Sequence, residues 1–232
     1  AALRIHSIKA AGQARLYNGP SFDVATPVQA PVKDSLDSGV NEYYSRHFVG
    51  LDLSAQAFER LEFEACSFIN CDFSDATLRN SRFIECDFTD CTLNNLKLPS
   101  TRLRNVTFER CKLVDVNWTV LEWSRLSTSA ELTFRDCVLT DSTFHGMVMN
   151  ELVMQSCKAH GVDLREAKLT KADLSFTDFA DAQFGRTDLT DADFTEATGF
   201  DIDVLNNVMT RSRFSRYEAA RLLSGLDIEV VD

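Results

Sequence analysis

A large apolar side chain recurs at every fifth residue along most of the chain. A period of five fits neither the 3.6 residues of a helical turn nor the two-residue repeat of a strand. The chain must therefore change direction each time the pattern recurs, which predicts a solenoid. The first run of these central residues is Phe48, Leu53, Phe58, Phe63, Phe68, Phe73, Leu78, Phe83, Phe88, Leu93, Leu98, Leu103, Phe108, Leu113, Trp118 and Trp123.

The five-residue step is interrupted once, after Trp123. Eleven positions separate Trp123 from Phe134 where ten are expected, so one residue is added to the register. The step then resumes and continues to Phe214, with small side chains only at Ala159 and Gly199. The later central residues are Phe134, Leu139, Phe144, Met149, Met154, Ala159, Leu164, Leu169, Leu174, Phe179, Phe184, Leu189, Phe194, Gly199, Val204, Met209 and Phe214. Phe200 or Ile202 is expected to fill the core near Gly199.

The residue two positions before each centre is usually small, which predicts a second inward position with less room. The other three positions are mostly polar and are expected to face water. Each cysteine occupies the small position: Cys66, Cys71, Cys86, Cys91, Cys111, Cys137 and Cys157. A metal or redox ladder is one interpretation, but there is no CxxC spacing, and side chains on one wall point in parallel. Free thiols that act as small hydrophobic residues are the favoured interpretation.

This repeating unit resembles the pentapeptide repeat family. Residues 172–176 (ADLSF) and 192–196 (ADFTE) match the family consensus, and residues 71–73 and 86–88 match it with Cys in place of Ala. The resemblance implies an all-β fold, a right-handed quadrilateral β-helix in which four units form one square coil. About eight coils would stack to a height of about 40 Å. Residues 20 apart then lie above one another, so Phe48, Phe68, Phe88 and Phe108 are expected to form one stack.

Three segments follow from the register. Residues 1–45 lie outside it and are expected to form an N-terminal extension or cap; the chain does not begin with Met, which leaves processing or appended residues as interpretations of part of this segment. Residues 46–214 form the β-helix, with the break at 124–133. Residues 215–232 are expected to form a C-terminal capping or dimerisation helix and a tail. A capping box, Ser215 to Glu218, would start that helix, and residues 226–231 alternate as a short strand.

The charge and motifs exclude several functions. Residues 1–50 contain five basic and four acidic residues, so the formal charge of −11 leaves −12 for residues 51–232. An acidic body repels phosphate backbones, so direct nucleic-acid binding is not expected and a basic partner is. No apolar run is long enough for a membrane span, and no secretory signal begins the chain, so a cytoplasmic location is expected. No catalytic, cofactor-binding or metal-binding motif is present, and a convex rod should lack a concave pocket, so the protein is not expected to be an enzyme.

The resemblance extends to the albicidin-resistance and, more distantly, the quinolone-resistance members of the family. It rests on residues 117–119 (NWT), Trp123, the eleven-position gap to Phe134, and residues 218–223 (EAARLL) before 226–229 (LDIE). It implies a mimic of duplex DNA that binds DNA gyrase or topoisomerase IV, modulates it or protects it from topoisomerase poisons, and forms a homodimer through its C-terminal helix. The alternative is a structural protein-interaction scaffold with no topoisomerase target.

The candidate partner-binding positions fall into three groups. Of the acidic positions, Asp141, Asp181 and Asp201 are expected to share a wall, and the full set is Asp136, Asp141, Asp173, Asp181, Asp191, Asp193, Glu196 and Asp201. The second group is a segment after Trp123 that forms either a projecting loop or a bulge: Ser124, Arg125, Leu126, Ser127, Thr128 and Ser129. The third is the expected dimer interface: Tyr217, Ala219, Leu222, Leu223, Leu226 and Ile228.

Overall fold

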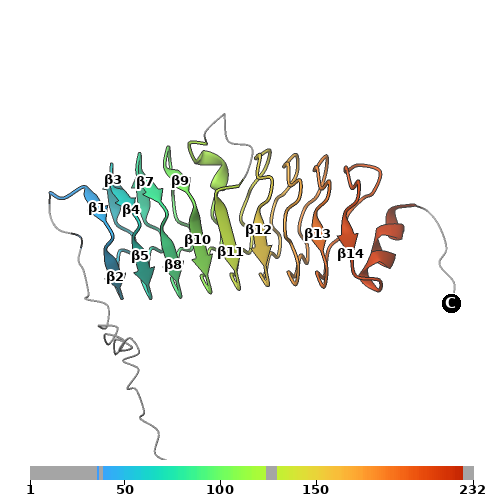
Figure 1. Ribbon diagram of the computed structural model, residues 1–232, viewed down its shortest axis with the longest axis horizontal. Helices are drawn as coiled ribbons and strands as arrows, with labels where there is room; N and C mark the ends of the chain where they lie inside the picture. Colours follow the sequence, from blue (N-terminus) through green and yellow to red (C-terminus); the bar gives the residue numbers. More distant parts are fainter. Residues whose placement is uncertain (1–35, 37–38, 124–129, 227–232) are drawn as a thin grey trace, which may run out of the picture. The chain divides into compact units, whose positions relative to one another are not determined.

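Square coils stack on one another through the described part of the chain. The structure is a computed structural model that describes residues 36, 39–123 and 130–226, apart from the side chains of Ser224 and Gly225. The predicted solenoid of about eight coils is confirmed. Figure 1 shows the coils in order from β1 to β14, with a short helix at the C-terminal end of the stack.

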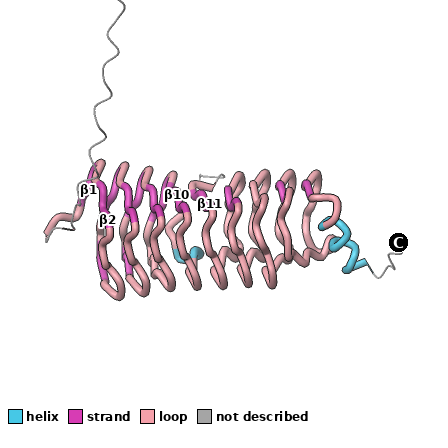
Figure 2. Tube along the Cα trace, turned by 90° about the horizontal axis from the view of Figure 1, so that it is seen from below, coloured by secondary structure: helices cyan, strands magenta, loops and turns pink. Residues whose placement is uncertain are grey.

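The strands are short, and all of their pairings are parallel. They are β1 (Glu42–Tyr44), β2 (His47–Val49), β3 (Ala57–Glu59), β4 (Glu62–Glu64), β5 (Ser67–Ile69), β6 (Thr77–Arg79), β7 (Arg82–Ile84), β8 (Asp87–Thr89), β9 (Arg102–Arg104), β10 (Val106–Glu109), β11 (Leu132–Arg135), β12 (Val153–Gln155), β13 (Asp193–Phe194) and β14 (Arg213–Phe214). The sheets run in the orders β1-β4-β7-β9, β12-β11-β10-β8-β5-β2, β3-β6 and β13-β14. Most strands lie in the N-terminal coils, whereas the later coils are joined mainly by isolated bridges (Figure 2).

Most corners of the coils are made by a residue in the left-handed backbone region. Positive φ values recur at five-residue steps, as at Asn70 (φ 52°), Asp75 (φ 58°) and Asn80 (φ 55°). Asn and Asp tolerate this conformation better than most residues. The corner N–H groups donate to the next coil, for example from Asn70 to the Thr89 carbonyl at 3.0 Å. These hydrogen bonds hold the corners, which the five-residue period required.

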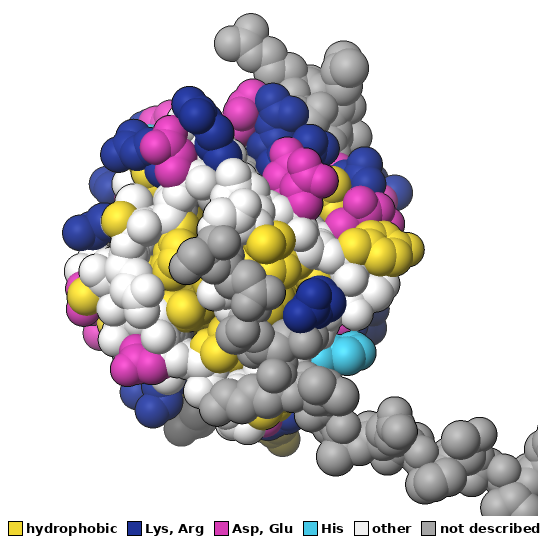
Figure 3. Space-filling model, turned by 90° about the vertical axis from the view of Figure 1, so that its left-hand side faces the viewer, with side chains coloured by type: hydrophobic (Ala, Val, Ile, Leu, Met, Phe, Trp, Pro, Cys, Tyr) yellow, Lys and Arg dark blue, Asp and Glu magenta, His cyan; other side chains and the backbone are white. Residues whose placement is uncertain are grey.

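The core is built from the two predicted inward positions. Rings of neighbouring coils stack in parallel: the centroids of Phe48 and Phe68 are 5.0 Å apart, and those of Phe68 and Phe88 are 4.6 Å apart. The column continues through Phe108 to Phe134, whose centroids are 5.4 Å apart. All seven cysteines are buried free thiols, as predicted. Viewed from the end that holds β1, apolar side chains lie near the centre and charged ones around the rim (Figure 3).

The register break adds six residues to one coil. Glu122 still follows Arg102 at the 20-residue step, and its N–H donates to Thr101. Past the break, Phe108 aligns with Phe134, a separation of 26 residues. The prediction of one added residue was therefore incomplete, because a whole extra five-residue unit leaves the five-step register unchanged. The six residues 124–129 lie outside the described part.

One column of cysteines continues across the break because of this offset. Lys112 pairs with Val138, so the coil that begins at Cys111 stacks directly on the one that begins at Cys137. Cys71, Cys91, Cys111, Cys137 and Cys157 consequently form one column through consecutive coils. Each thiol lies near a backbone carbonyl of the preceding coil, as for Cys111 and Phe88 at 3.4 Å.

Two short 3-10 helices accompany the coils. η1 (Trp118–Val120) follows Asn117, whose side chain accepts from the N–H of Thr119. Trp118 is fully buried and stacks on Phe144 at 5.6 Å, so its interpretation as a core residue is confirmed. η2 (Glu218–Leu226) lies at the C-terminal end of the stack.

The capping box predicted at Ser215 is wrong. The hydroxyl of Ser215 accepts from the N–H of Glu196 and donates to the Glu196 carboxylate, both at 2.8 Å. Ser215 thus ties the last coil to the one before it. The interpretation of residues near Gly199 is confirmed, since Phe200 is fully buried and packs edge-to-face against Phe194 and at a tilt against Phe214.

Candidate functional site

One of the four walls of the coil stack carries an excess of aspartates. We name this wall the aspartate face; it comprises residues 51–55, 71–75, 91–95, 111–115, 137–141, 157–161, 177–181 and 197–201. Parallel bridges align these segments, from Asp52 with Asp72 at one end to Asp178 with Thr198 at the other. Against two lysines, Lys112 and Lys158, the face carries eight aspartates: Asp52, Asp72, Asp75, Asp115, Asp141, Asp178, Asp181 and Asp201.

The carboxylates of this face have few basic neighbours, the exception being Asp178, which lies near Lys158 and His160. Within the described residues, no lysine or arginine forms an ion pair with them. Their hydrogen bonds come from uncharged groups, such as Asn95 to Asp75 at 2.5 Å, except where His160 contacts Asp178 at 2.7 Å. Hydrogen bonds from the side chain and backbone of Ser54 lower the pKa of Asp52. The aspartate face is therefore a surface of unneutralised negative charge.

In the part of the chain that the structure describes, six acids of the other three walls form ion pairs with arginines one coil away. Arg110 contacts Asp90 at 2.8 Å, and Arg211 binds Asp191 through two hydrogen bonds of 2.6 Å. Charge-assisted pairs of this kind keep both groups ionised but cancel their field at a distance. Among the described residues, the ion pairs with arginine thus lie outside the aspartate face.

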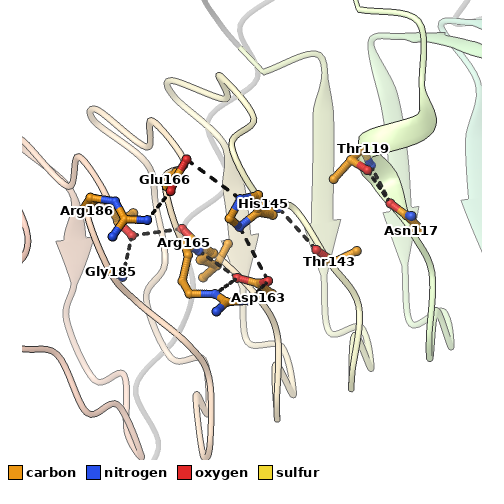
Figure 4. Close-up of polar contacts among 11 residues, drawn as sticks. Asn117, Thr119, Thr143, His145, Asp163, Arg165, Glu166, Gly185 and Arg186 are labelled. Carbon is orange, nitrogen blue, oxygen red and sulfur yellow. Dashed lines mark hydrogen bonds and ion pairs between the residues drawn. The ribbon is translucent and has the colours of Figure 1, made fainter.

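A network on the wall that holds η1 shows this cancellation in detail. His145 lies between Asp163 and Glu166, at 3.7 and 3.9 Å (Figure 4). Asp163 in turn binds Arg165 through two hydrogen bonds, of 2.9 and 2.7 Å, and Glu166 binds Arg186. The hydrogen bond from Arg165 outweighs partial burial and lowers the pKa of Asp163. This arrangement stabilises the stack and leaves little net charge for a partner.

The structure brings together only part of the predicted acidic set. Asp141 and Asp181 are exposed at left-handed corners of the aspartate face, with φ of 58° and 61°. Asp201 follows at the next 20-residue step and is also exposed, and Asp136 lies at the corner beside this face.

The remaining predicted acids lie on other walls and have partners. Asp191 pairs with Arg211, and Asp193 pairs with Arg213 at 3.0 Å. Asp173 accepts from the hydroxyl of Ser175 at 2.6 Å, and Glu196 accepts from Ser215. An arginine that faces an acid across one coil stands 20 residues away in sequence, so a search for opposite charges at that spacing would have found both ion pairs.

Sequence analysis also missed five members of the aspartate face, namely Asp52, Asp72, Asp75, Asp115 and Asp178. Four of them precede the break, whereas the predicted acids all follow it. Asp115 stacks on Asp141, but this can be recognised only when the 26-residue separation across the break is known.

The other two predicted groups are less well placed for contact. Ser124 to Ser129 lie outside the described residues, so the choice between a loop and a bulge stays a prediction. Of the dimer candidates, Tyr217 is 90% exposed, whereas Leu222 packs against the hydrophobic core. Ala219, Leu223 and Leu226 are half-buried, and Ile228 lies outside the residues that the structure describes.

A groove also borders the break, contrary to the expectation of a rod without concave pockets. Its volume is about 830 Å³, and its lining includes Arg82, Arg102, Arg104 and Trp123. Two of the arginines are already engaged, Arg82 with Glu62 and Arg102 with Glu122.

The described residues contain neither a cluster of side chains suited to a metal ion nor a helix that could span a membrane. No group of three or more His, Cys, Asp or Glu side chains there is arranged to hold a metal ion. None of the helices in that same part has the length and hydrophobicity needed to cross a bilayer.

Comparisons with known proteins place this geometry in context. The pentapeptide repeat region model matches residues 61–130, and the model of eight pentapeptide repeat copies matches residues 160–195. No curated protein matches the sequence.

Several solved structures are similar to the coil stack. Full-length QnrB1, a plasmid-mediated fluoroquinolone resistance protein, is 20% identical over 78% of this chain and 100% of its own, with a TM-score of 0.45. A trypsin-treated variant of QnrB1 is 19% identical over 82% and 92%, with a TM-score of 0.44. HetL, a heterocyst differentiation regulator from a Nostoc cyanobacterium, is 16% identical over 75% and 87%, with a TM-score of 0.33.

Proposed function

The chain is a pentapeptide repeat protein, and we propose that it acts without catalysis, by presenting the aspartate face to a DNA-binding protein as a mimic of duplex DNA. The observation that carries the proposal is the row of aspartates on one wall of the stack, none of which forms an ion pair with a lysine or arginine among the described residues. The partner we propose is a type II topoisomerase, DNA gyrase or topoisomerase IV. Binding would modulate the enzyme or protect it from topoisomerase poisons.

The spacing of charge on this face supports mimicry better than the net charge does. Eight aspartates are distributed over eight coil segments, so one carboxylate occurs on average per coil. With coils about 4.8 Å apart, the linear density of carboxylates is about 0.7 of the density of phosphates, which lie about 3.4 Å apart along one DNA strand. A basic saddle that binds a phosphate strand would meet a comparable row of anions.

The test uses two pairs of substitutions at left-handed corners, where Asn replaces Asp without altering the backbone preference. Asp141→Asn with Asp181→Asn removes two charges from the aspartate face. Asp90→Asn with Asp191→Asn removes two charges that arginines already neutralise. Supercoiling by DNA gyrase is measured with and without a poison, together with the affinity of the purified enzyme at low and moderate salt.

The first pair should weaken binding by about tenfold and reduce its salt dependence, whereas the second should change neither appreciably. Melting temperature serves as the control for folding. A wild-type protein that neither inhibits nor rescues gyrase at high concentration would refute the topoisomerase proposal. The alternative, a scaffold with another target, would then be favoured.

Assembly into a homodimer through η2 is part of the proposal. The support is Tyr217, which is 90% exposed next to the start of the helix. Leu222 already packs against the core, so a substitution there would disturb folding as well as assembly. Tyr217→Ser is the sharper test, and sedimentation should show monomers; a wild-type protein that is itself monomeric would end this part of the proposal. The cytoplasm, where the proposed partner acts, is the proposed location.

A further inference from the structure

Phe176 is an aromatic residue at a left-handed corner, and more than half of its side chain is exposed. Its φ is +58°, and it is the only aromatic residue among the described non-glycine residues with positive φ. Bulky residues rarely adopt this conformation, which is strained for them. The side chain is also 57% exposed, so burial does not offset the strain. Both observations point to a role outside the fold.

The surroundings of Phe176 are acidic. The N–H of Phe176 donates to Thr195 at 3.0 Å, and Asp173 pairs with Asp193, so Phe176 stacks directly on Glu196 at the same corner. Glu196 is exposed, and its only hydrogen bonds among the described residues join it to Ser215, not to a basic group. Asp178, a member of the aspartate face, follows two residues after Phe176.

We propose that Phe176 and Glu196 form a binding site for an arginine side chain of the protein partner, at the edge of the aspartate face. A guanidinium group stacks flat on an aromatic ring while its N–H groups bind a carboxylate in a fork. Neighbouring coils are about 4.8 Å apart, which suits one planar group that contacts both residues. A lysine ammonium has no such plane, so the site should prefer arginine.

This inference rests on the proposed function for the identity of the partner, but its chemistry can be tested without topoisomerase. The probes are hexaarginine and hexalysine peptides, whose binding is measured by calorimetry at low salt. Wild-type protein should bind hexaarginine more tightly than hexalysine. Phe176→Asn should lower hexaarginine affinity by about two- to fivefold and leave hexalysine affinity nearly unchanged. Glu196→Gln should lower both affinities and reduce the preference.

Matched variants separate the site from its surroundings. Ser156→Asn changes an exposed left-handed corner one coil away, with φ of 55°, and should leave both affinities unchanged. Phe176→Trp should restore or raise the preference for arginine, because Trp binds cations best. Phe176→Asn should melt no lower than wild type, since Asn relieves the strain.

These measurements test the arginine site independently of the topoisomerase proposal. A wild-type protein without preference for arginine, or a Phe176→Asn variant that binds hexaarginine as wild type does, would overturn the inference. A lower melting temperature for Phe176→Asn would also overturn it, because Phe176 would then serve the fold. Absence of gyrase binding together with a Phe176-dependent arginine preference would refute only the topoisomerase partner.

Discussion

Gly199 and Gly146 allow the tightness of stacking to be measured with one methyl group each. Both have positive φ, 72° and 69°, so alanine is strained at either position. A Cβ at Gly199 would lie 2.7 Å from the backbone nitrogen of Ala180, which cannot move without breaking the stack. A Cβ at Gly146 would meet nothing within 4 Å. The two alanine substitutions thus share the backbone strain, but only the one at Gly199 makes the added Cβ overlap a neighbouring coil.

The magnitudes follow from these contacts. Left-handed alanine costs about 1–2 kcal/mol, and the loss of glycine's freedom in the unfolded chain returns about 0.4–1 kcal/mol. Gly146→Ala should therefore lower the free energy of unfolding by about 1 kcal/mol. Overlap with a packed neighbour adds about 1–3 kcal/mol, so Gly199→Ala should lower it by about 2–4 kcal/mol.

Urea denaturation followed by circular dichroism measures both losses. Because each coil depends mainly on its neighbours, hydrogen exchange should show the loss from Gly199→Ala concentrated in the C-terminal coils. Gly161→Ala should fall between the two, since its Cβ would meet the movable carboxylate of Asp141 at 2.5 Å. Equal losses for Gly146→Ala and Gly199→Ala would refute the reasoning, because the overlap would then cost nothing.

Two further predictions concern titratable groups. A hydrogen bond with the thiol of the next coil, together with burial, raises the pKa of Cys91 and Cys111 to about 12. Ellman's reagent at pH 8 should therefore label these two thiols slowly in the native protein and at once in the urea-unfolded protein; rapid native labelling of Cys91 or Cys111 would contradict the buried column. Hydrogen bonds from arginines lower the pKa of Asp90, Asp163, Asp191, Glu122 and Glu166. A carboxyl group whose pKa is lowered by folding stabilises the fold at pH values above its pKa in the unfolded chain, near 4, and this stabilisation is lost as the pH falls further. The melting temperature should therefore be level from pH 7 to 5 and drop below about pH 4. The drop should be less steep in Asp191→Asn.

The five-residue ladder predicted the core because each inward position can be recognised from residue type alone. Phe48, Phe68 and Phe88 stack as expected, and the cysteines occupy the small inward position. The same ladder cannot report which wall a residue occupies after the break, because one added residue and six added residues leave it in the same phase. The stacking of Phe108 on Phe134 therefore required the structure.

The candidate surface was harder to predict because it depends on pairing across coils as well as on composition. Residue type alone cannot separate Asp191, which an arginine neutralises, from Asp181, which has no basic partner among the described residues. The capping box failed for a similar reason. The sequence placed Ser215 at the start of a helix, whereas in the structure it lies beside a coil corner, where its hydroxyl forms hydrogen bonds with Glu196.

Position and net charge can be separated by moving charges without changing their number. Ser45 and Ser100 are exposed left-handed corners away from the aspartate face, with φ of 50° and 55°, so aspartate fits the backbone at both. A protein with Asp141→Asn, Asp181→Asn, Ser45→Asp and Ser100→Asp keeps the formal charge of −11. If the total field drives association, this protein should bind the partner as wild type does. Because the row of aspartates along one wall is what resembles a strand of phosphates, we expect it instead to bind about tenfold more weakly, as Asp141→Asn with Asp181→Asn does. Wild-type affinity in the relocated variant would show that the aspartate face has no geometric role, even though the partner prefers an acidic protein.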